Sequence, residues 1–176
     1  FDQYVDTDAV LAGLSEDAAA LLAENIDALH ARHPSDWFFH HDAAFMEQYM
    51  AERRAADIAF VRAALDYYFD SSRVPISRTD GAARWASDEM RAFAAAYTVT
   101  VGAVRTDGDR AEADAVLRGN DSTYGRLLPS AAVTFELVRA EDRRWKLVRV
   151  RTAADEHGFF SFVDAAERYW ALQGWD

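Results

Sequence analysis

The chain has 176 residues, of which 51% are apolar, with no cysteine and a formal net charge of −11. This length predicts one domain with a single core, and the lack of cysteine excludes disulfides, thiolate metal sites and a cysteine nucleophile. No apolar run approaches the roughly 18 residues of a membrane span. We expect a soluble protein and favour the cytoplasm, although a chain that begins at Phe1 leaves a removed leader open.

Two helical segments are predicted before residue 34. Thr7 or Asp8 can cap a first short turn, which Gly13 ends. Ser15, followed by two acidic residues at the positive end of the helix dipole, caps a second helix. Its apolar residues recur every three to four positions until Pro34 stops it.

Two more helices are predicted before the middle of the chain. A long run with helical spacing predicts one helix over about residues 42–70. Residues 71–81 have the composition of a loop. Ser87 and the two acidic residues after it predict the start of a third helix, which carries Met90 and Phe93.

The second half changes to the period-two alternation of strands. Asp107-Gly108 and Glu141-Asp142-Arg143 indicate turns, and residues 119–130 are expected to form a polar loop. Ser161 caps a final helix that Gly174 ends. The alternating segments predict four strands, over residues 97–103, 111–117, 133–137 and 145–151.

This order of elements predicts an α+β fold. We expect N-terminal helices packed on a curved, cone-like sheet of four antiparallel strands, with a C-terminal helix. Residues 1–40 are interpreted as a helical elaboration and residues 41–176 as a single α+β domain. The alanines at positions 111, 113 and 115 leave little side-chain volume on one face of that sheet, which favours close helix packing or a hollow.

The segment from about Ala55 to Thr152 resembles the nuclear-transport-factor-two-like superfamily, which includes the SnoaL-like polyketide cyclases. The resemblance rests on a long amphipathic helix that ends in Ala-Leu-Asp-Tyr-Tyr-Phe-Asp (64–70), a later short helix with Met-Arg-Ala-Phe (90–93), and a β-meander that ends in Arg-Trp-Lys-Leu-Val-Arg-Val (144–150). It implies a cone-shaped cavity between sheet and helices. Members include metal-independent isomerases, dehydratases and cyclases as well as binding modules, and no specific catalytic motif of those enzymes occurs in this chain.

The densest group of titratable residues lies between His30 and Asp42, where four of the five histidines fall within 12 residues. Imidazole is the commonest base near neutral pH, so His40, His41 and Asp42 are candidate acid–base residues. The alternative is a polar connection between two helices. No metal-ligand spacing is present, and we expect no metal site.

Asp66 is the fourth candidate catalytic residue, because a carboxyl group beside aromatic rings can serve as a general acid or base. Its neighbour Tyr67 is a candidate ligand contact. Further aromatic candidates for a cavity lining or rim are Trp85, Tyr97, Tyr124 and Phe135. Tyr124 lies in the expected polar loop, which favours a mobile rim.

Six basic residues occur between Arg139 and Arg151 in an otherwise acidic protein. By strand alternation, Arg149 and Arg151 share a face with Leu147. They are candidate contacts for a carboxylate or phosphate group, and the alternative is a solvated face paired with neighbouring acids. Residues 1–96 hold 17 acidic and 8 basic residues, and this acidity argues against nucleic acid as a partner.

These observations favour a small-molecule-binding cavity domain for a small, partly apolar molecule. The catalytic version of this hypothesis is a metal-independent lyase, isomerase or cyclase that uses acid–base chemistry, and the sequence does not decide whether the chain is an enzyme. The alternative is a non-catalytic interaction or accessory module that forms a homodimer through its sheet. No cofactor is expected, because neither a dinucleotide-binding nor a Walker motif is present.

Overall fold

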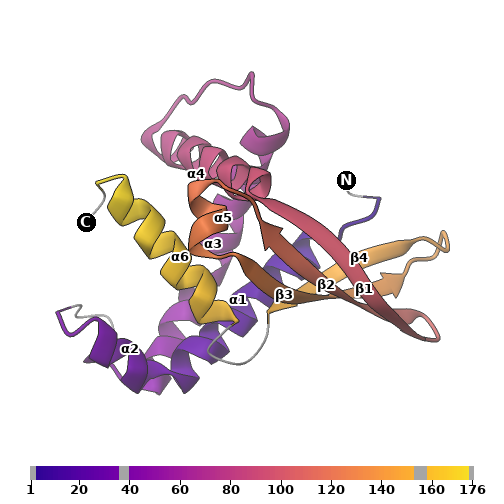
Figure 1. Ribbon diagram of the computed structural model, residues 1–176, viewed down its shortest axis with the longest axis horizontal. Helices are drawn as coiled ribbons and strands as arrows, with labels where there is room; N and C mark the ends of the chain where they lie inside the picture. Colours follow the sequence, from indigo (N-terminus) through magenta and orange to yellow (C-terminus); the bar gives the residue numbers. More distant parts are fainter. Residues whose placement is uncertain (1–2, 36–39, 153–157, 175–176) are drawn as a thin grey trace.

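The computed structural model describes residues 3–35, 40–152 and 158–174. It confirms the predicted α+β class, since helices precede a four-stranded antiparallel sheet in the order β1-β2-β3-β4 and a helix follows it (Figure 1). No helix among the described residues is long and apolar enough to cross a bilayer. The elements are α1 (Thr7–Glu24), α2 (Ile26–Arg32), α3 (Ala43–Phe69), α4 (Arg78–Ala95), β1 (Tyr97–Asp107), β2 (Arg110–Gly119), α5 (Thr123–Leu127), β3 (Ser130–Arg139), β4 (Trp145–Thr152) and α6 (Phe159–Leu172).

The first helix differs from the prediction at both ends. Asp6 caps α1, because its carboxylate accepts a hydrogen bond from the amide of Ala9 at 3.1 Å. The helix then continues through Gly13 and ends at Asn25, whose side-chain amide donates to the carbonyl of Leu21 at 2.8 Å. A Cβ at position 13 would lie 3.2 Å from Cγ of Arg149 in β4. Gly13 therefore makes room for the sheet and does not end the helix.

The long helix α3 matches its prediction, but α4 and α6 begin elsewhere than expected. Ser77 caps α4, with its hydroxyl accepting from the amide of Asp80 at 3.1 Å. Ser87, the predicted start, lies inside α4 and is fully buried. In α6 the cap position is Gly158, and Ser161 falls in the first turn.

All four predicted strands are present, and their alternation separates an apolar from a charged face. Cross-strand partners share a face, so Val101, Ala115 and Val133 lie together on the apolar one. The other face carries Asp114 and Arg105. Buried alanines at positions 111, 113, 115 and 131 line the apolar face of the two central strands.

The helices gather at one end of the sheet, whereas the β1–β2 and β3–β4 turns lie at the other (Figure 1). Near the helical end, Leu128, Ala131 and Ala165 form a buried cluster against which Tyr97 and Phe162 pack. Most of β1 lies beyond this cluster, and each of its residues after Tyr97 is exposed. One buried cluster therefore sits where α5 and α6 meet the strands, while other buried side chains, such as Met46 and Tyr67, lie among the helices.

Candidate functional site

An open apolar hollow of about 330 Å³ lies between α4, α5 and α6. Trp85, Glu89 and Phe93 follow one another at four-residue steps along α4, which places them on one face of the helix. Tyr124 comes from α5 and Trp170 from α6. We call this site the aromatic pocket; its lining residues are Trp85, Ala86, Glu89, Met90, Phe93, Tyr124 and Trp170.

The rings of the aromatic pocket contact one another in two sets, the pair Trp85–Trp170 and a group around Phe93 and Tyr124. Trp85 and Trp170 form a tilted pair with centroids 6.2 Å apart and planes at 42°. Phe93 packs perpendicular to Tyr124, with centroids 5.5 Å apart. On its far side, Tyr124 stacks on Tyr169 at 3.8 Å. The edge-to-face contact of Phe93 with Tyr124 is an arrangement that aromatic quadrupoles favour.

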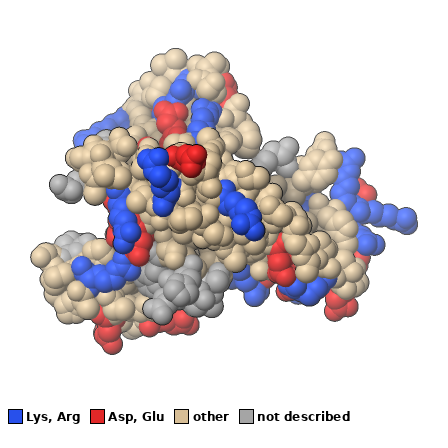
Figure 2. Space-filling view, in the orientation of Figure 1, with Lys and Arg blue, Asp and Glu red and all other residues tan. Residues whose placement is uncertain are grey.

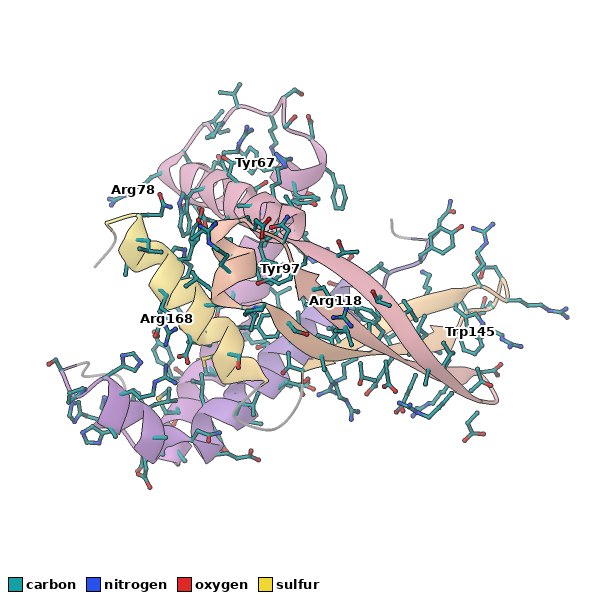
Figure 3. The ribbon with its side chains drawn as sticks, viewed as in Figure 1. Tyr67, Arg78, Tyr97, Arg118, Trp145 and Arg168 are labelled. Carbon is teal, nitrogen blue, oxygen red and sulfur yellow. The ribbon has the colours of Figure 1, made fainter. Side chains whose placement is uncertain are left out.

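One carboxylate lies among these rings. The hydroxyl of Tyr124 donates a hydrogen bond to Oε2 of Glu89 at 3.0 Å. Burial, together with this neighbouring carboxylate, raises the pKa of Tyr124 well above the usual tyrosine value. The phenol therefore keeps its proton and acts as a donor. Tyr97 supports the same region from β1, because its hydroxyl donates to the carbonyl of Tyr124 at 3.1 Å (Figure 3).

The segment that carries Tyr124 is a helix and not the predicted loop. Ser122 caps α5 by accepting from the amide of Gly125 at 3.2 Å. The segment is held against α4 through Asn120, whose backbone amide donates to the carbonyl of Ala96 at 2.9 Å. Tyr124 is only 5% exposed. Local capping and two glycines at close approach hold this turn against the sheet, whereas the predicted mobility of the rim stays a prediction.

Gly119 and Gly125 permit that close approach. A Cβ on Gly125 would collide with backbone atoms of Asn120, and one on Gly119 would lie 2.7 Å from the Cα of Gly125. Only residues without a Cβ fit at these two positions without a backbone shift. The glycines that suggested a flexible loop are thus a packing requirement for the pocket wall.

Of the predicted ligand contacts, Trp85 and Tyr124 line the aromatic pocket and Tyr97 lies next to it, but the others lie elsewhere. Tyr67 is 1% exposed, with the Arg73 guanidinium 5.1 Å from its ring centroid, so it belongs to the core between α3 and α4. Phe135 is half-buried on the apolar face of β3.

Arg149 and Arg151 lie on the charged face, opposite to Leu147. The predicted shared face is wrong because Val148 forms a bulge, so that Arg149 pairs with Glu136 while Leu147 pairs with Leu137. Both arginines have acidic partners within the chain: Arg149 forms an ion pair with Asp17 of α1, and Arg151 with Glu136. These ion pairs agree with the alternative interpretation, in which the arginines pair with acidic residues of the same chain.

The arginines near the β3–β4 turn also lie beside acidic residues. Figure 2 shows lysine and arginine side chains gathered at the end of the molecule that holds the β3–β4 turn. There Arg139 stacks on Trp145 at 4.7 Å and lies 3.8 Å from Asp109. Arg144 lies 3.8 Å from Asp142. Arg139 and Arg144 thus lie beside acidic residues, as Arg149 and Arg151 do.

The histidine-rich segment forms a small cavity of about 280 Å³ at the start of α3. His30 and His40 meet edge to face at 4.2 Å, and Nε2 of His40 lies 2.8 Å from the carbonyl of Pro34. His41 stacks on Phe45 at 3.8 Å. Among the described residues, no three acidic or histidine side chains are arranged to hold a metal ion.

Asp42, the third predicted member of this group, caps α3. Its carboxylate accepts from the amide of Phe45 at 2.9 Å. This hydrogen bond gives the residue a structural role at the helix N-terminus. The structure brings His40, His41 and Asp42 together in one cavity, apart from the aromatic pocket.

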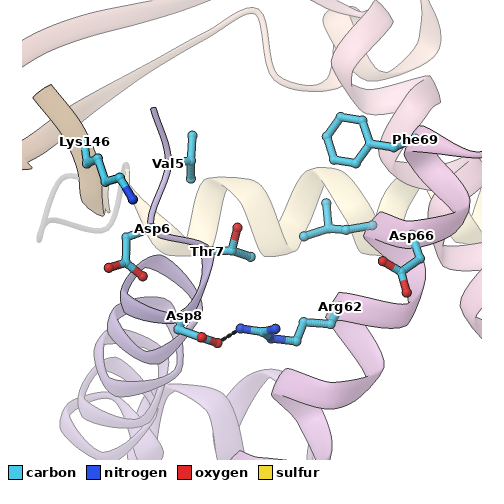
Figure 4. A pocket seen from close by; sticks show the side chains of 9 residues that line it. Val5, Asp6, Thr7, Asp8, Arg62, Asp66, Phe69 and Lys146 are labelled. Atoms are coloured by element: carbon cyan, nitrogen blue, oxygen red, sulfur yellow. Dashed lines mark ion pairs between the residues drawn. The ribbon is translucent and has the colours of Figure 1, made fainter. Parts of the chain in front are cut away.

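Asp66 lies in a third place, a polar groove of about 710 Å³ between the N-terminal segment, α3 and β4 (Figure 4). Its carboxylate lies 3.3 Å from the guanidinium of Arg73. Across the groove, Asp8 forms an ion pair with Arg62, and Lys146 is the remaining cation of the lining. Because the lining carries both acidic and basic side chains, its net charge is small.

Sequence reasoning named two of the lining residues, Trp85 and Tyr124, and missed the other five, among them Glu89 and Trp170. Glu89 was interpreted as one of the acidic residues at the start of a helix. Its position four residues after Trp85 and four residues before Phe93 was therefore not used to predict a site. That spacing is the signal that could have found it. Trp170 reaches the pocket only because α6 folds back on α4 and α5, which no local pattern predicts.

The chain matches no protein-family model, and comparisons with curated proteins and with solved structures give no match either. The resemblance to the nuclear-transport-factor-two-like superfamily therefore stays a prediction. The class defined by the structure is that of an α+β protein with an open four-stranded antiparallel sheet.

Proposed function

We propose that the chain is a small-molecule-binding domain whose site is the aromatic pocket. The observation that carries the proposal is an open apolar hollow lined by four aromatic residues and by one hydrogen-bonded glutamate. Ligand sites are typically apolar hollows with a few well-placed polar groups. The volume of about 330 Å³ suits a small, partly apolar molecule.

The proposal concerns binding and does not assign a reaction. His40, His41, Asp42 and Asp66, which we expected to act as acid–base residues, line other cavities. Catalysis by these residues stays a separate prediction. Within the aromatic pocket, the hydroxyl of Tyr124 keeps its proton and donates a hydrogen bond to Glu89.

Filling the pocket tests the proposal. Ala86 lines it, so Ala86→Leu adds three carbon atoms inside, whereas Ala82 is exposed on the same helix and Ala82→Leu is a matched control. A panel of small aliphatic and aromatic molecules is screened by ligand-observed NMR against both variants. We expect compounds that bind the unsubstituted chain and Ala82→Leu to lose binding to Ala86→Leu. Equal binding to all three chains would contradict the proposal.

A second candidate is a module that dimerises through its sheet. The observation in its favour is β1, an edge strand whose Val99, Val101 and Val104 are 51%, 57% and 59% exposed. Exposed apolar edge strands can pair with another chain. Light scattering over a range of protein concentrations measures the mass in solution, and a monomer at every concentration would contradict this candidate.

A further inference from the structure

We infer that the ligand of the aromatic pocket is a small organic cation, such as a quaternary ammonium compound. This inference rests on the proposed binding function and names its ligand class. It follows from three features of the lining: the carboxylate of Glu89, the faces of the aromatic rings, and the lack of lysine or arginine among the described residues that line the pocket.

Two neighbouring acids on α4 show what is special about Glu89. Asp88 lies 3.5 Å from Arg84 and 3.8 Å from Arg91, and it is 55% exposed. Among the described residues, no arginine or lysine lies within 4.0 Å of the Glu89 carboxylate, and its hydrogen-bond donor is the neutral hydroxyl of Tyr124. The pocket therefore holds a negative charge that the described part of the chain does not pair with a cation.

The walls add a second attraction for positive charge. The π face of an aromatic ring is negative, and a cation within about 6 Å of a ring centroid is attracted to it. Trp85 and Trp170 lie at 42° to each other with centroids 6.2 Å apart, and their side chains are 41% and 37% exposed. A methylated ammonium group can therefore contact indole surface while it approaches the carboxylate of Glu89.

Other ligand classes fit the same walls less well. An anion would be repelled by the carboxylate of Glu89. A neutral molecule without a hydrogen-bond donor would displace water from the carboxylate without replacing the lost hydration. A cation compensates that loss, and the net charge of −11 attracts it toward the protein.

The test compares choline with its uncharged isostere, in which a carbon atom replaces the nitrogen. Affinities are measured by NMR titration on the full chain. We expect choline to bind about tenfold more tightly than the isostere, as a carboxylate and partly exposed aromatic faces together allow. Equal binding of the two probes would overturn the cation inference and leave the proposed binding function standing.

Variants locate the effect at the pocket. Glu89→Gln keeps an acceptor for Tyr124 but removes the charge, and it should weaken choline binding about tenfold. Asp88→Asn removes the same charge from an ion-paired position on α4 and should change binding by less than about twofold. If the two variants weaken binding equally, the effect is that of net charge and the inference fails.

A tryptophan pair completes the test. Trp170→Leu should weaken choline binding, whereas Trp145→Leu, at the far end of the sheet, should not (Figure 3). Thermal unfolding followed by circular dichroism confirms that each variant is folded. If choline does not bind the unsubstituted chain at millimolar concentration, the cation inference is overturned, while the Ala86→Leu screen still judges the proposed binding function independently.

Discussion

The two ends of β1 differ sharply in their surroundings. At its start, Tyr97 is half-buried and packs on Phe93 at 4.7 Å, where α4, α5 and α6 converge. Farther along the same strand, Val101 and Val104 are more than half exposed although they share the apolar face with buried alanines. An alternating pattern thus marks which residues share a face, but tertiary packing decides which part of that face is covered.

The largest expected effect lies at the packed end. Gly125→Ala should lower the free energy of unfolding by about 3 kcal/mol, because its Cβ would collide with backbone atoms of Asn120 and displace α5. Gly81→Ala is a control with the opposite expected sign. Gly81 lies in α4 with no atom within 4 Å of the new Cβ, so the substitution should raise the free energy of unfolding by about 0.5–1 kcal/mol. Urea unfolding measures both, and a nearly neutral Gly125→Ala would contradict the close packing.

The strands were predictable because one face of the sheet is consistently apolar, from Val99 on β1 to Val133 on β3. The period of two along a strand is a local property of the backbone, and it does not depend on which elements pack against the sheet. The bulge at Val148 is different, since it adds one residue and reverses the face of Arg149 without any signal in the alternation. Strand alternation therefore predicts the face of a residue correctly only until a bulge interrupts the strand.

Helix ends were harder, because glycine and serine carry more than one meaning. Glycine is common where helices end, but Gly13 lies inside α1 and faces Arg149. Serine is common where helices begin, but Ser87 is buried inside α4. The same limit applies to the site. Trp85 and Tyr124 were found as aromatic residues, whereas Trp170 joins them only through the packing of α6.

An intermediate effect is expected at the hydrogen bond inside the aromatic pocket. Tyr124→Phe removes the donor to Glu89 and should lower stability by about 1 kcal/mol at neutral pH. The native pKa of Tyr124 is raised, so above a pH of about 10 the unfolded chain loses a proton that the folded chain keeps. Stability should therefore fall as the pH rises beyond that point.

The alkaline decline isolates Tyr124 when variants are compared. Because Tyr124→Phe has no proton to lose at this position, its stability should decline less steeply above a pH of about 10. Tyr4→Phe, at a side chain that is 60% exposed, serves as the control and should decline like the unsubstituted chain. Urea unfolding at several alkaline pH values gives the slopes, and parallel slopes for all three chains would contradict the raised pKa of Tyr124.

The smallest effect within one chain is expected at the open end. Val101 is 57% exposed, so Val101→Lys should change the free energy of unfolding by less than about 0.5 kcal/mol in a monomer. Thr100→Lys places the same charge on the opposite face of β1. If a second copy covers the apolar face, Val101→Lys alone should reduce the mass seen by light scattering at high concentration. If the copies instead pair edge to edge along β1, both lysines reduce it, because the charge lies beside the paired edge from either face.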